Sequence, residues 1–177
     1  MISEHHKFKI MSYNEKSKYY FKLEKSRISK KLGKNFEIYH IGSTAVPGLG
    51  GKRTIDILVL AQKKREAKKI ISALEELGYL HKAEAGDKYR IFFNINRLFK
   101  KETRHMHIHL MWKTENDYKK YLIFRNYLRK HKQEADRYYS LKKLWFKKAK
   151  GDRRKFTKMK KKSGYIEEVI EKAKNIA

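Results

Sequence analysis

The feature that most constrains the fold is a seven-residue apolar run, Thr54–Leu60 (TIDILVL), in which one acid, Asp56, stands among aliphatic and β-branched residues. Such a run is typical of a central β-strand that is buried on both faces. A second strand-like segment, Phe36–Ile41 (FEIYHI), precedes it, and a glycine-dense loop (GSTAVPGLGG) joins the two. The chain is therefore expected to form a sheet whose buried central strand carries one carboxylate.

Helical periodicity and strict alternation divide the rest of the chain. Apolar residues recur at helical spacing in residues 14–32 with Gly33 as a cap, in Lys63–Leu77, from Asn116 to near Gly151, and in Tyr165–Ala173. Arg90–Asn96 and His105–Leu110 alternate apolar and polar residues, and the basic stretch between them predicts an antiparallel hairpin. This order predicts an α/β (α+β) fold, a mixed sheet flanked by helices with a helical C-terminal part.

Nothing in the sequence marks a domain boundary, because it has no internal repeat, no Pro- or Ser-rich linker and only one proline. We expect residues 1–177 to form a single domain, with the sheet in about residues 1–112 and the helical part in about residues 113–177. The chain has no cysteine, which excludes disulfides and thiolate metal sites. No apolar run approaches the ~20 residues of a membrane span and the N-terminus is charged, so we expect a cytoplasmic protein without membrane contact.

The charge balance points to an anionic partner. The chain has 46 Lys and Arg against 19 Asp and Glu, a formal charge of +27. The excess is densest in residues 142–162, which hold twelve Lys or Arg and one Asp. Such a surface favours RNA or another polyanion. The alternative is a generally lysine-rich surface with no nucleic-acid role.

The glycine-dense loop and the acid that follows it predict a phosphate site. Glycines let backbone N–H groups surround an anion, and Ser43 and Thr44 add hydroxyl donors. The spacing matches neither a P-loop nor a dinucleotide-binding turn, so an ordinary tight loop stays open as an interpretation. Asp56 needs a partner because an unpaired buried carboxylate is costly. That partner is either structural, such as Lys52, Arg53 or a backbone donor, or a bound metal facing phosphate.

The stretch His40–Val59 (HIGSTAVPGLGGKRTIDILV) resembles the signature of the GrpB-like family, which belongs to the nucleotidyltransferase superfamily. Further segments resemble that family in the same order, namely LEELGY (Leu74–Tyr79), the strand with Arg104, His107 and His109, FRNYLR (Phe124–Arg129) and KSGYI (Lys162–Ile166). The resemblance covers nearly the whole chain. It implies a nucleotidyltransferase-like sheet.

In that superfamily the Gly-Ser turn holds the phosphates of a nucleoside triphosphate. Carboxylates hold divalent ions, Mg²⁺ or Mn²⁺, which activate a hydroxyl as pyrophosphate leaves. The resemblance therefore implies catalytic roles for Ser43 and Asp56. With the neighbouring cations, the candidate phosphate ligands are His40, Gly42, Ser43, Thr44, Lys52, Arg53, Arg90 and Lys162, and the candidate metal ligands are Asp56, His107 and His109.

Three departures, two from the superfamily pattern and one from the family pattern, bear on the site. Leu58 stands two residues beyond Asp56, where a second metal carboxylate is expected. His107 and His109 stand near the place of the third carboxylate, and imidazoles suit a transition metal better than Mg²⁺. Position 53 is Arg where the family usually has Pro, which adds a phosphate donor.

These observations leave three functions open. The first is an enzyme that binds a nucleoside triphosphate and transfers a nucleotidyl group to an acceptor. The second is a module that binds a nucleotide or RNA without chemistry, which Leu58 and residues 142–162 favour. The third is a metal-dependent hydrolase that uses Asp56, His107 and His109, which requires these side chains to converge. The sequence specifies neither the acceptor, the base, the metal nor the oligomeric state.

Overall fold

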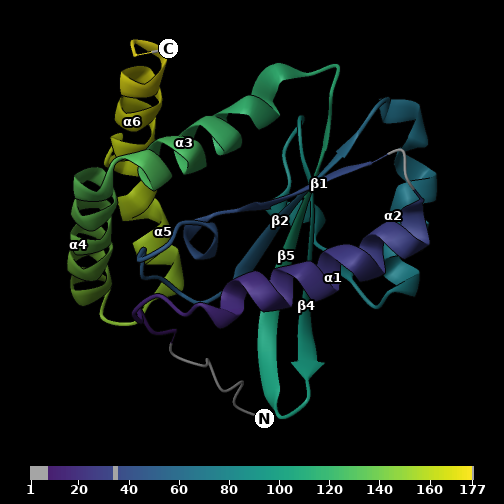
Figure 1. Cartoon of the computed structure of the whole chain (residues 1–177), viewed down its shortest axis with the longest axis horizontal. Helices are drawn as coiled ribbons and strands as arrows, with labels where there is room; N and C mark the ends of the chain where they lie inside the picture. Colours follow the sequence, from purple (N-terminus) through teal and green to yellow (C-terminus); the bar gives the residue numbers. More distant parts are fainter. Residues whose placement is uncertain (1–7, 34–35, 177) are drawn as a thin grey trace.

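The computed structural model describes residues 8–33 and 36–176, and within them five strands form one mixed sheet in the order β1-β2-β5-β4-β3 (Figure 1). β2 and β5 run parallel, whereas the other neighbouring strands are antiparallel. The strands are β1 (Glu37–Ile41), β2 (Ile55–Ala61), β3 (Leu80–His81), β4 (Ile91–Phe99) and β5 (Glu102–Trp112). The apolar run that contains Asp56 is therefore an inner strand, with β1 on one side and β5 on the other.

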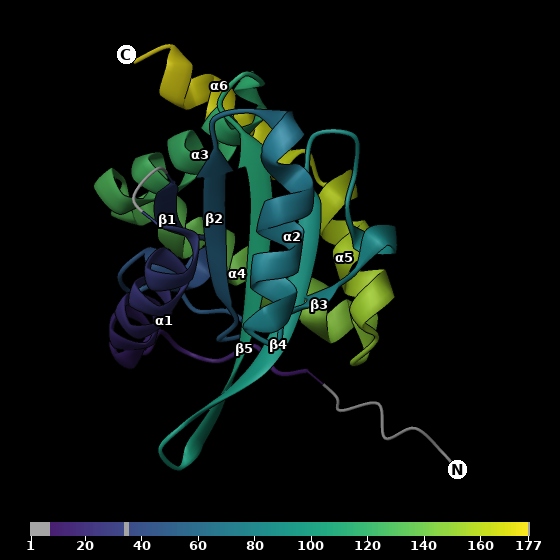
Figure 2. The ribbon, with the colours of Figure 1, turned by 90° about the vertical axis from the view of Figure 1, so that its right-hand side faces the viewer.

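Helices cover both sides of this sheet. In the described ranges they are α1 (Lys16–Leu32), α2 (Ala67–Glu76), α3 (Lys119–Lys130), α4 (Lys132–Ala149), α5 (Arg153–Lys162) and α6 (Tyr165–Lys174). Figure 1 shows α4, α5 and α6 grouped on one side, and Figure 2 shows α2 lying along the sheet. Short 3₁₀ turns at Ser43–Ala45, Lys64–Glu66, Ala83–Ala85 and Asn116–Tyr118 connect these elements.

The two faces of β2 meet different surroundings because side chains alternate along a strand. Ile55, Ile57 and Val59 are buried against α1 and α2 in the main core. On the opposite face, Leu58 is fully buried in a small apolar cluster against residues at the start of α3. Asp56 shares that face but lies beyond the apolar cluster. The change from apolar to polar along one face of β2 thus creates a polar floor next to the helical part.

The predicted fold class is confirmed, including the antiparallel hairpin of β4 and β5 and the helical C-terminal part. Gly33 ends α1 as expected, with φ 88° and its N–H bonded to the Ser29 carbonyl. The predicted gap between Gly151 and Tyr165 was wrong, because this segment forms α5. Asp152 caps α5 by accepting hydrogen bonds from the N–H groups of Arg154 at 2.8 Å and Lys155 at 3.0 Å.

Among the helices that the structure describes, each is too short or too polar to cross a membrane. The charged N-terminal segment, which argues against a signal sequence, falls largely on residues 1–7, and these lie outside the described ranges.

Candidate functional site

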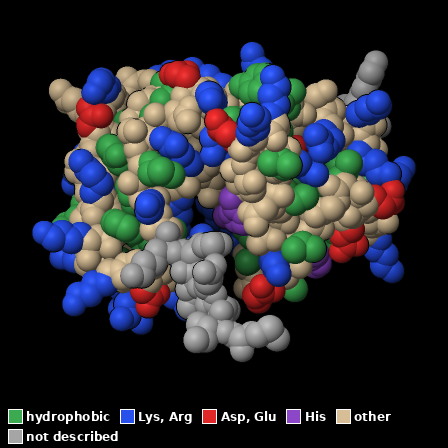
Figure 3. Space-filling view, turned by 90° about the horizontal axis from the view of Figure 1, so that it is seen from below, with side chains coloured by type: hydrophobic (Ala, Val, Ile, Leu, Met, Phe, Trp, Pro, Cys, Tyr) green, Lys and Arg blue, Asp and Glu red, His purple; other side chains and the backbone are tan. Residues whose placement is uncertain are grey.

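The polar floor of the sheet forms one wall of a cleft of about 700 Å³. The loop after β1, strands β2, β4 and β5, and helices α4 and α5 all contribute side chains to it. Figure 3 shows a hollow in this face with histidine at its wall and Lys and Arg side chains around it. Eight Lys or Arg line the cleft against three Asp or Glu. Several segments of a basic chain therefore converge on one electropositive cavity.

The turn that leaves β1 depends on glycine at position 42. Gly42 has φ 72°, and a Cβ atom there would lie 2.5 Å from Oδ2 of Asp56. Any side chain would therefore collide with the carboxylate in addition to straining the backbone. The Gly42–Ser43 turn and Asp56 are thus in direct contact, which places Ser43 at the edge of the cleft.

His40 and Thr44 brace this turn from inside the protein. The Thr44 hydroxyl donates to the Thr54 carbonyl at 3.0 Å, so it can only accept at the 2.9 Å contact with Nε2 of His40. The His40 ring also stacks on Phe21, and burial lowers the pKa of His40 to about 4. His40 is not among the described residues that line the cleft, and the Thr44 hydroxyl is already occupied. Their predicted contacts with phosphate therefore find no support in the geometry.

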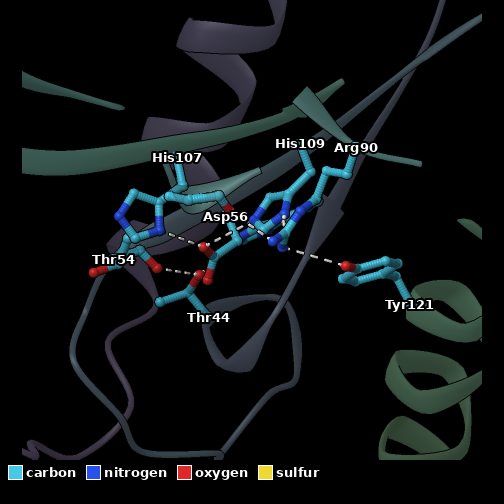
Figure 4. Close-up of polar contacts among 9 residues, drawn as sticks. Thr44, Thr54, Asp56, Arg90, His107, His109 and Tyr121 are labelled. Atoms are coloured by element: carbon cyan, nitrogen blue, oxygen red, sulfur yellow. Dashed lines mark hydrogen bonds and ion pairs between the residues drawn. The ribbon is translucent and has the colours of Figure 1, made fainter. Parts of the chain in front are cut away.

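Asp56 receives hydrogen bonds from two histidines of the neighbouring strand, which the parallel pairing of β2 and β5 brings beside it (Figure 4). Its Oδ1 atom lies 2.9 Å from Nδ1 of His107 and 3.5 Å from Nε2 of His109. Burial alone would raise the pKa of Asp56, but these hydrogen bonds outweigh it and hold the pKa well below its usual range. Asp56 is therefore an ionised acceptor, and both facing ring nitrogens carry protons.

Arg90 fixes the protonation of His109 from the other side of its ring. Nη1 of Arg90 lies 3.3 Å from Nδ1 of His109 and 3.4 Å from the Tyr121 hydroxyl, and Nη2 donates to the Ala85 carbonyl at 2.8 Å. A guanidinium can only donate, so Nδ1 of His109 accepts and its Nε2 carries the proton. Burial also lowers the pKa of His109 and favours its neutral form. The Arg90 guanidinium is thus engaged by the protein instead of extending freely into the cleft.

The predicted metal ligands do converge, but their hydrogen bonds do not fit a resident metal. Asp56, His107 and His109 each offer an atom within 4.8 Å of the others. One carboxylate and two imidazoles are a poor set for Mg²⁺. A transition metal on Nε2 of His109 would move the proton to Nδ1, where it would face the donor group of Arg90. Metal-bound histidines normally donate that second proton to an acceptor. The metal site stays a prediction of the resemblance, and the pattern here argues against it.

Lys142 is a site residue that the sequence analysis did not single out. Its Nζ donates to Ser43 Oγ at 2.9 Å and to the Gly50 carbonyl, and the residue is 3% exposed. No described carboxylate lies within ion-pair distance of it. Burial, helped by the nearby Lys160, lowers the pKa of Lys142 to about 7. The buried face of α4 consists of Ala135, Tyr138, Lys142, Trp145 and Ala149, and a lysine in that periodic row was the signal available in the sequence.

Other cations line the same cleft. Lys52 lies over the rings of Phe8 and Phe156, at 4.7 Å from each centroid, and burial together with Arg153 lowers its pKa to about 8. Arg53 also lines the cleft and has φ 58°, a value that proline cannot adopt. Lys162 is exposed and lies outside the described lining, where Lys160 and Lys161 stand instead.

Comparisons with known proteins agree with this architecture. A family profile described as "GrpB protein" matches residues 7–172. The chain is 36% identical over 121 residues to "UPF0157 protein PA4798" of Pseudomonas aeruginosa, covering 68% of this chain and 49% of that protein. It therefore spans about half the length of that relative.

The similarity extends to a solved structure. The crystal structure of conserved protein GrpB from Enterococcus faecalis has a TM-score of 0.78 at 26% identity, covering 93% of this chain and 96% of that chain. The Cid1 poly(U) polymerase with MgGTP bound aligns at a TM-score of 0.48 and 16% identity, covering 67% of this chain and 39% of that chain. The profile match spans most of the chain, and the relative from Pseudomonas aeruginosa is more than 30% identical to it. Both matches confirm the family that the His40–Val59 signature predicted. The chain belongs to the GrpB family.

Proposed function

We propose that the cleft binds the phosphate chain of a nucleoside triphosphate. The observation that carries this proposal is the buried ammonium group of Lys142, whose partners among the described residues are a hydroxyl and a carbonyl but no carboxylate. An unpaired buried cation is costly to hold in a folded protein. An anion arriving beside Ser43 would supply the missing negative charge, since Lys142 and Ser43 both line the cleft.

The surrounding side chains support the same ligand class. Lys52, Arg53 and Arg153 add positive charge from two segments of the chain. A volume of about 700 Å³ lies within the usual range for small-molecule sites. Phe92, on the polar face of β4, provides an aromatic wall for a base. A highly charged ligand with one aromatic group matches this lining better than a neutral metabolite.

Nucleotidyl transfer is the finer expectation from the resemblance. The position of the second metal carboxylate holds Leu58, which is fully buried in an apolar cluster under α3. A two-metal mechanism therefore lacks its ligands here. The proposal is accordingly nucleotide binding, with any turnover depending on groups other than a pair of carboxylates.

Nucleoside triphosphates are expected to raise the melting temperature of the protein, and nucleosides to do little. Ligand at ~100 times its dissociation constant stabilises a folded protein by about 2.7 kcal/mol. The proposed contacts are made mainly to the phosphates, so a nucleoside should bind weakly and stabilise little. Differential scanning calorimetry with each of the four ribonucleoside triphosphates, its nucleoside and inorganic triphosphate measures the effect. Equal shifts from nucleoside and triphosphate would contradict phosphate recognition.

A second candidate, RNA binding, rests on the surface of α5. This helix exposes Arg153, Arg154, Lys155, Lys158, Lys161 and Lys162, and Asp152 at its N-terminus pairs with Lys155 at 4.0 Å. Arg153 and Lys161 also line the cleft, so the basic surface is continuous with the proposed phosphate site. A polyanion lying along α5 could therefore reach the cleft.

Replacing Arg154, Lys158 and Lys162 by Gln is expected to weaken binding of single-stranded RNA regardless of its sequence. Each lost phosphate contact reduces the slope of log affinity against log salt by about 0.7, so the slope should become shallower by up to about two. Fluorescence anisotropy over a salt series measures it. These residues lie outside the described cleft lining, so triphosphate binding should persist.

The matched control removes Lys22, Lys25 and Lys30, three exposed lysines of α1 on the far side of the sheet. It carries the same change in net charge but should leave the salt slope nearly unchanged. If both triple variants weaken RNA binding equally, net charge alone explains the effect, and α5 has no specific role in RNA binding.

A further inference from the structure

Four side chains form one hydrogen-bonded series across the floor of the cleft (Figure 4). Arg90 donates to Nδ1 of His109, Nε2 of His109 donates to Asp56, and Nδ1 of His107 donates to the same carboxylate oxygen. Two members of the series fix these directions, because the Arg90 guanidinium can only donate and the ionised Asp56 carboxylate can only accept. It leaves one ring nitrogen outside the series, Nε2 of His107.

We infer that His107 is the general base of this site and accepts a proton at Nε2 from an oxygen nucleophile that attacks a phosphorus of the bound nucleotide. This inference rests on the proposed function. In the step, the nucleophile is water or a hydroxyl, and its oxygen forms a bond to the α-phosphorus. The bond from that phosphorus to pyrophosphate breaks, pyrophosphate leaves with the electron pair, and the proton of the nucleophile moves to His107.

The carboxylate behind the ring suits His107 to this task. Asp56 accepts the Nδ1 proton at 2.9 Å, which orients the ring and stabilises the imidazolium that forms when Nε2 takes a proton. His107 lines the cleft and its side chain is 22% exposed, so a ligand can reach it. The ring of Phe92 packs edge-on against His107, with 4.8 Å between centroids, and limits its rotation.

The other two histidines of the strand are less suited to accept a proton. His109 has both ring nitrogens engaged, by Arg90 and by Asp56. His105 bonds through Nδ1 to the Asn96 side chain at 2.8 Å, and that partner is neutral. His107 alone among them combines a carboxylate partner with an unengaged nitrogen. Arg90, His109 and Asp56 are therefore positioning residues.

The first arm of the experiment observes the ring protons directly. Nitrogen-15 NMR of histidine-labelled protein should show His107 as the Nδ1–H tautomer and His109 as the Nε2–H tautomer. Addition of Zn²⁺ alone should leave both assignments in place. A His109 ring protonated at Nδ1, or coordination shifts of both rings with Zn²⁺, would overturn the inference in favour of a metal site.

The second arm measures pyrophosphate release from the four ribonucleoside triphosphates with water or glycerol as acceptor, alongside nucleotide affinity by calorimetry. His107→Gln should lower the release rate by at least about a hundredfold with little change in affinity, since a general base contributes about 10²–10⁴-fold. His105→Gln is the matched control, on the same face of the same strand, and should retain the rate. Added imidazole should partly restore His107→Ala.

The outcomes separate this inference from the proposed function. Intact nucleotide binding with no release by the wild type, or with an unchanged rate in His107→Gln, would overturn the base role and leave binding standing. Loss of nucleotide affinity in His107→Gln would assign His107 to binding and overturn the inference as well. Absence of any nucleotide binding by the wild type would remove the proposed function itself.

Discussion

Lys142→Met is expected to stabilise the ligand-free protein while weakening nucleoside triphosphate binding at least about thirtyfold. Methionine fills a similar volume in the buried row of α4 but carries no charge to desolvate. Replacing buried ion pairs by apolar groups of similar volume is often neutral or stabilising, by about 1–4 kcal/mol, and here no partner charge is left behind. Losing a buried charge from a phosphate contact costs about 2 kcal/mol or more, which corresponds to that loss of affinity.

The pH dependence of stability gives this prediction a second readout. The pKa of Lys142 is about 7 in the folded protein against an ordinary value near 10.5. Between these values the unfolded chain binds one more proton than the folded chain, so stability should rise as pH increases through this window. Lys142→Met removes the part of this rise that comes from Lys142. The free energies of unfolding of wild type and variant should therefore become more similar toward pH 10. Urea unfolding from pH 6 to pH 9.5 measures the difference.

The matched control is Lys143→Met, which removes the same charge from the next position of α4. Lys143 is exposed, and its Nζ lies 4.8 Å from the ring centroid of Tyr139. Stability and triphosphate affinity should change little in this variant. A Lys142→Met protein that is strongly destabilised at pH 7 and binds triphosphate normally would show that Lys142 only supports the Gly50 loop.

Most of the fold could be predicted from local patterns in the sequence. The apolar run around Asp56 and the alternation of Arg90–Asn96 and His105–Leu110 correspond to β2, β4 and β5. Helix α5 was missed because its charged sequence buries only Phe156, which gives a weak apolar period. The Asp152 cap was its clearest local signal. Charge density concealed a helix that tertiary contacts stabilise.

The candidate site could be predicted only in part. Gly42, Ser43 and Asp56 follow from the signature, but their contact depends on φ 72° at Gly42. The approach of His107 and His109 to Asp56 requires the parallel pairing of β2 and β5, which joins residues about fifty positions apart. Lys142 approaches Ser43 across an even longer separation, 99 residues. Periodicity reports which face of an element is buried, whereas these contacts depend on how the elements are assembled.

Asp56→Asn is expected to destabilise the ligand-free protein by about 1.5–3 kcal/mol. The carboxylate accepts hydrogen bonds from His107 and His109, and hydrogen bonds to charged groups contribute in this range. Because the folded pKa of Asp56 lies below its ordinary value, this contribution is present above about pH 4 and is lost in more acidic solution. The difference in free energy of unfolding between wild type and variant, measured by urea unfolding, should therefore decrease as pH falls from 7 toward 3.

Asp87→Asn provides the comparison, since Asp87 also lines the cleft and pairs with Arg90 at 3.4 Å, but its side chain is half exposed. An exposed pair contributes about 0–1 kcal/mol, so the stability of this variant should stay close to that of the wild type.

Asp56 could anchor the histidines or hold a metal ion, and triphosphate binding without divalent ions separates these two roles. If Asp56 only anchors the two histidines, its negative charge repels the phosphates of the ligand. Asp56→Asn should then bind triphosphate in EDTA at least as tightly as the wild type. If Asp56→Asn keeps full stability and loses only the gain in affinity that Mg²⁺ provides, Asp56 instead holds the ion that accompanies the nucleotide.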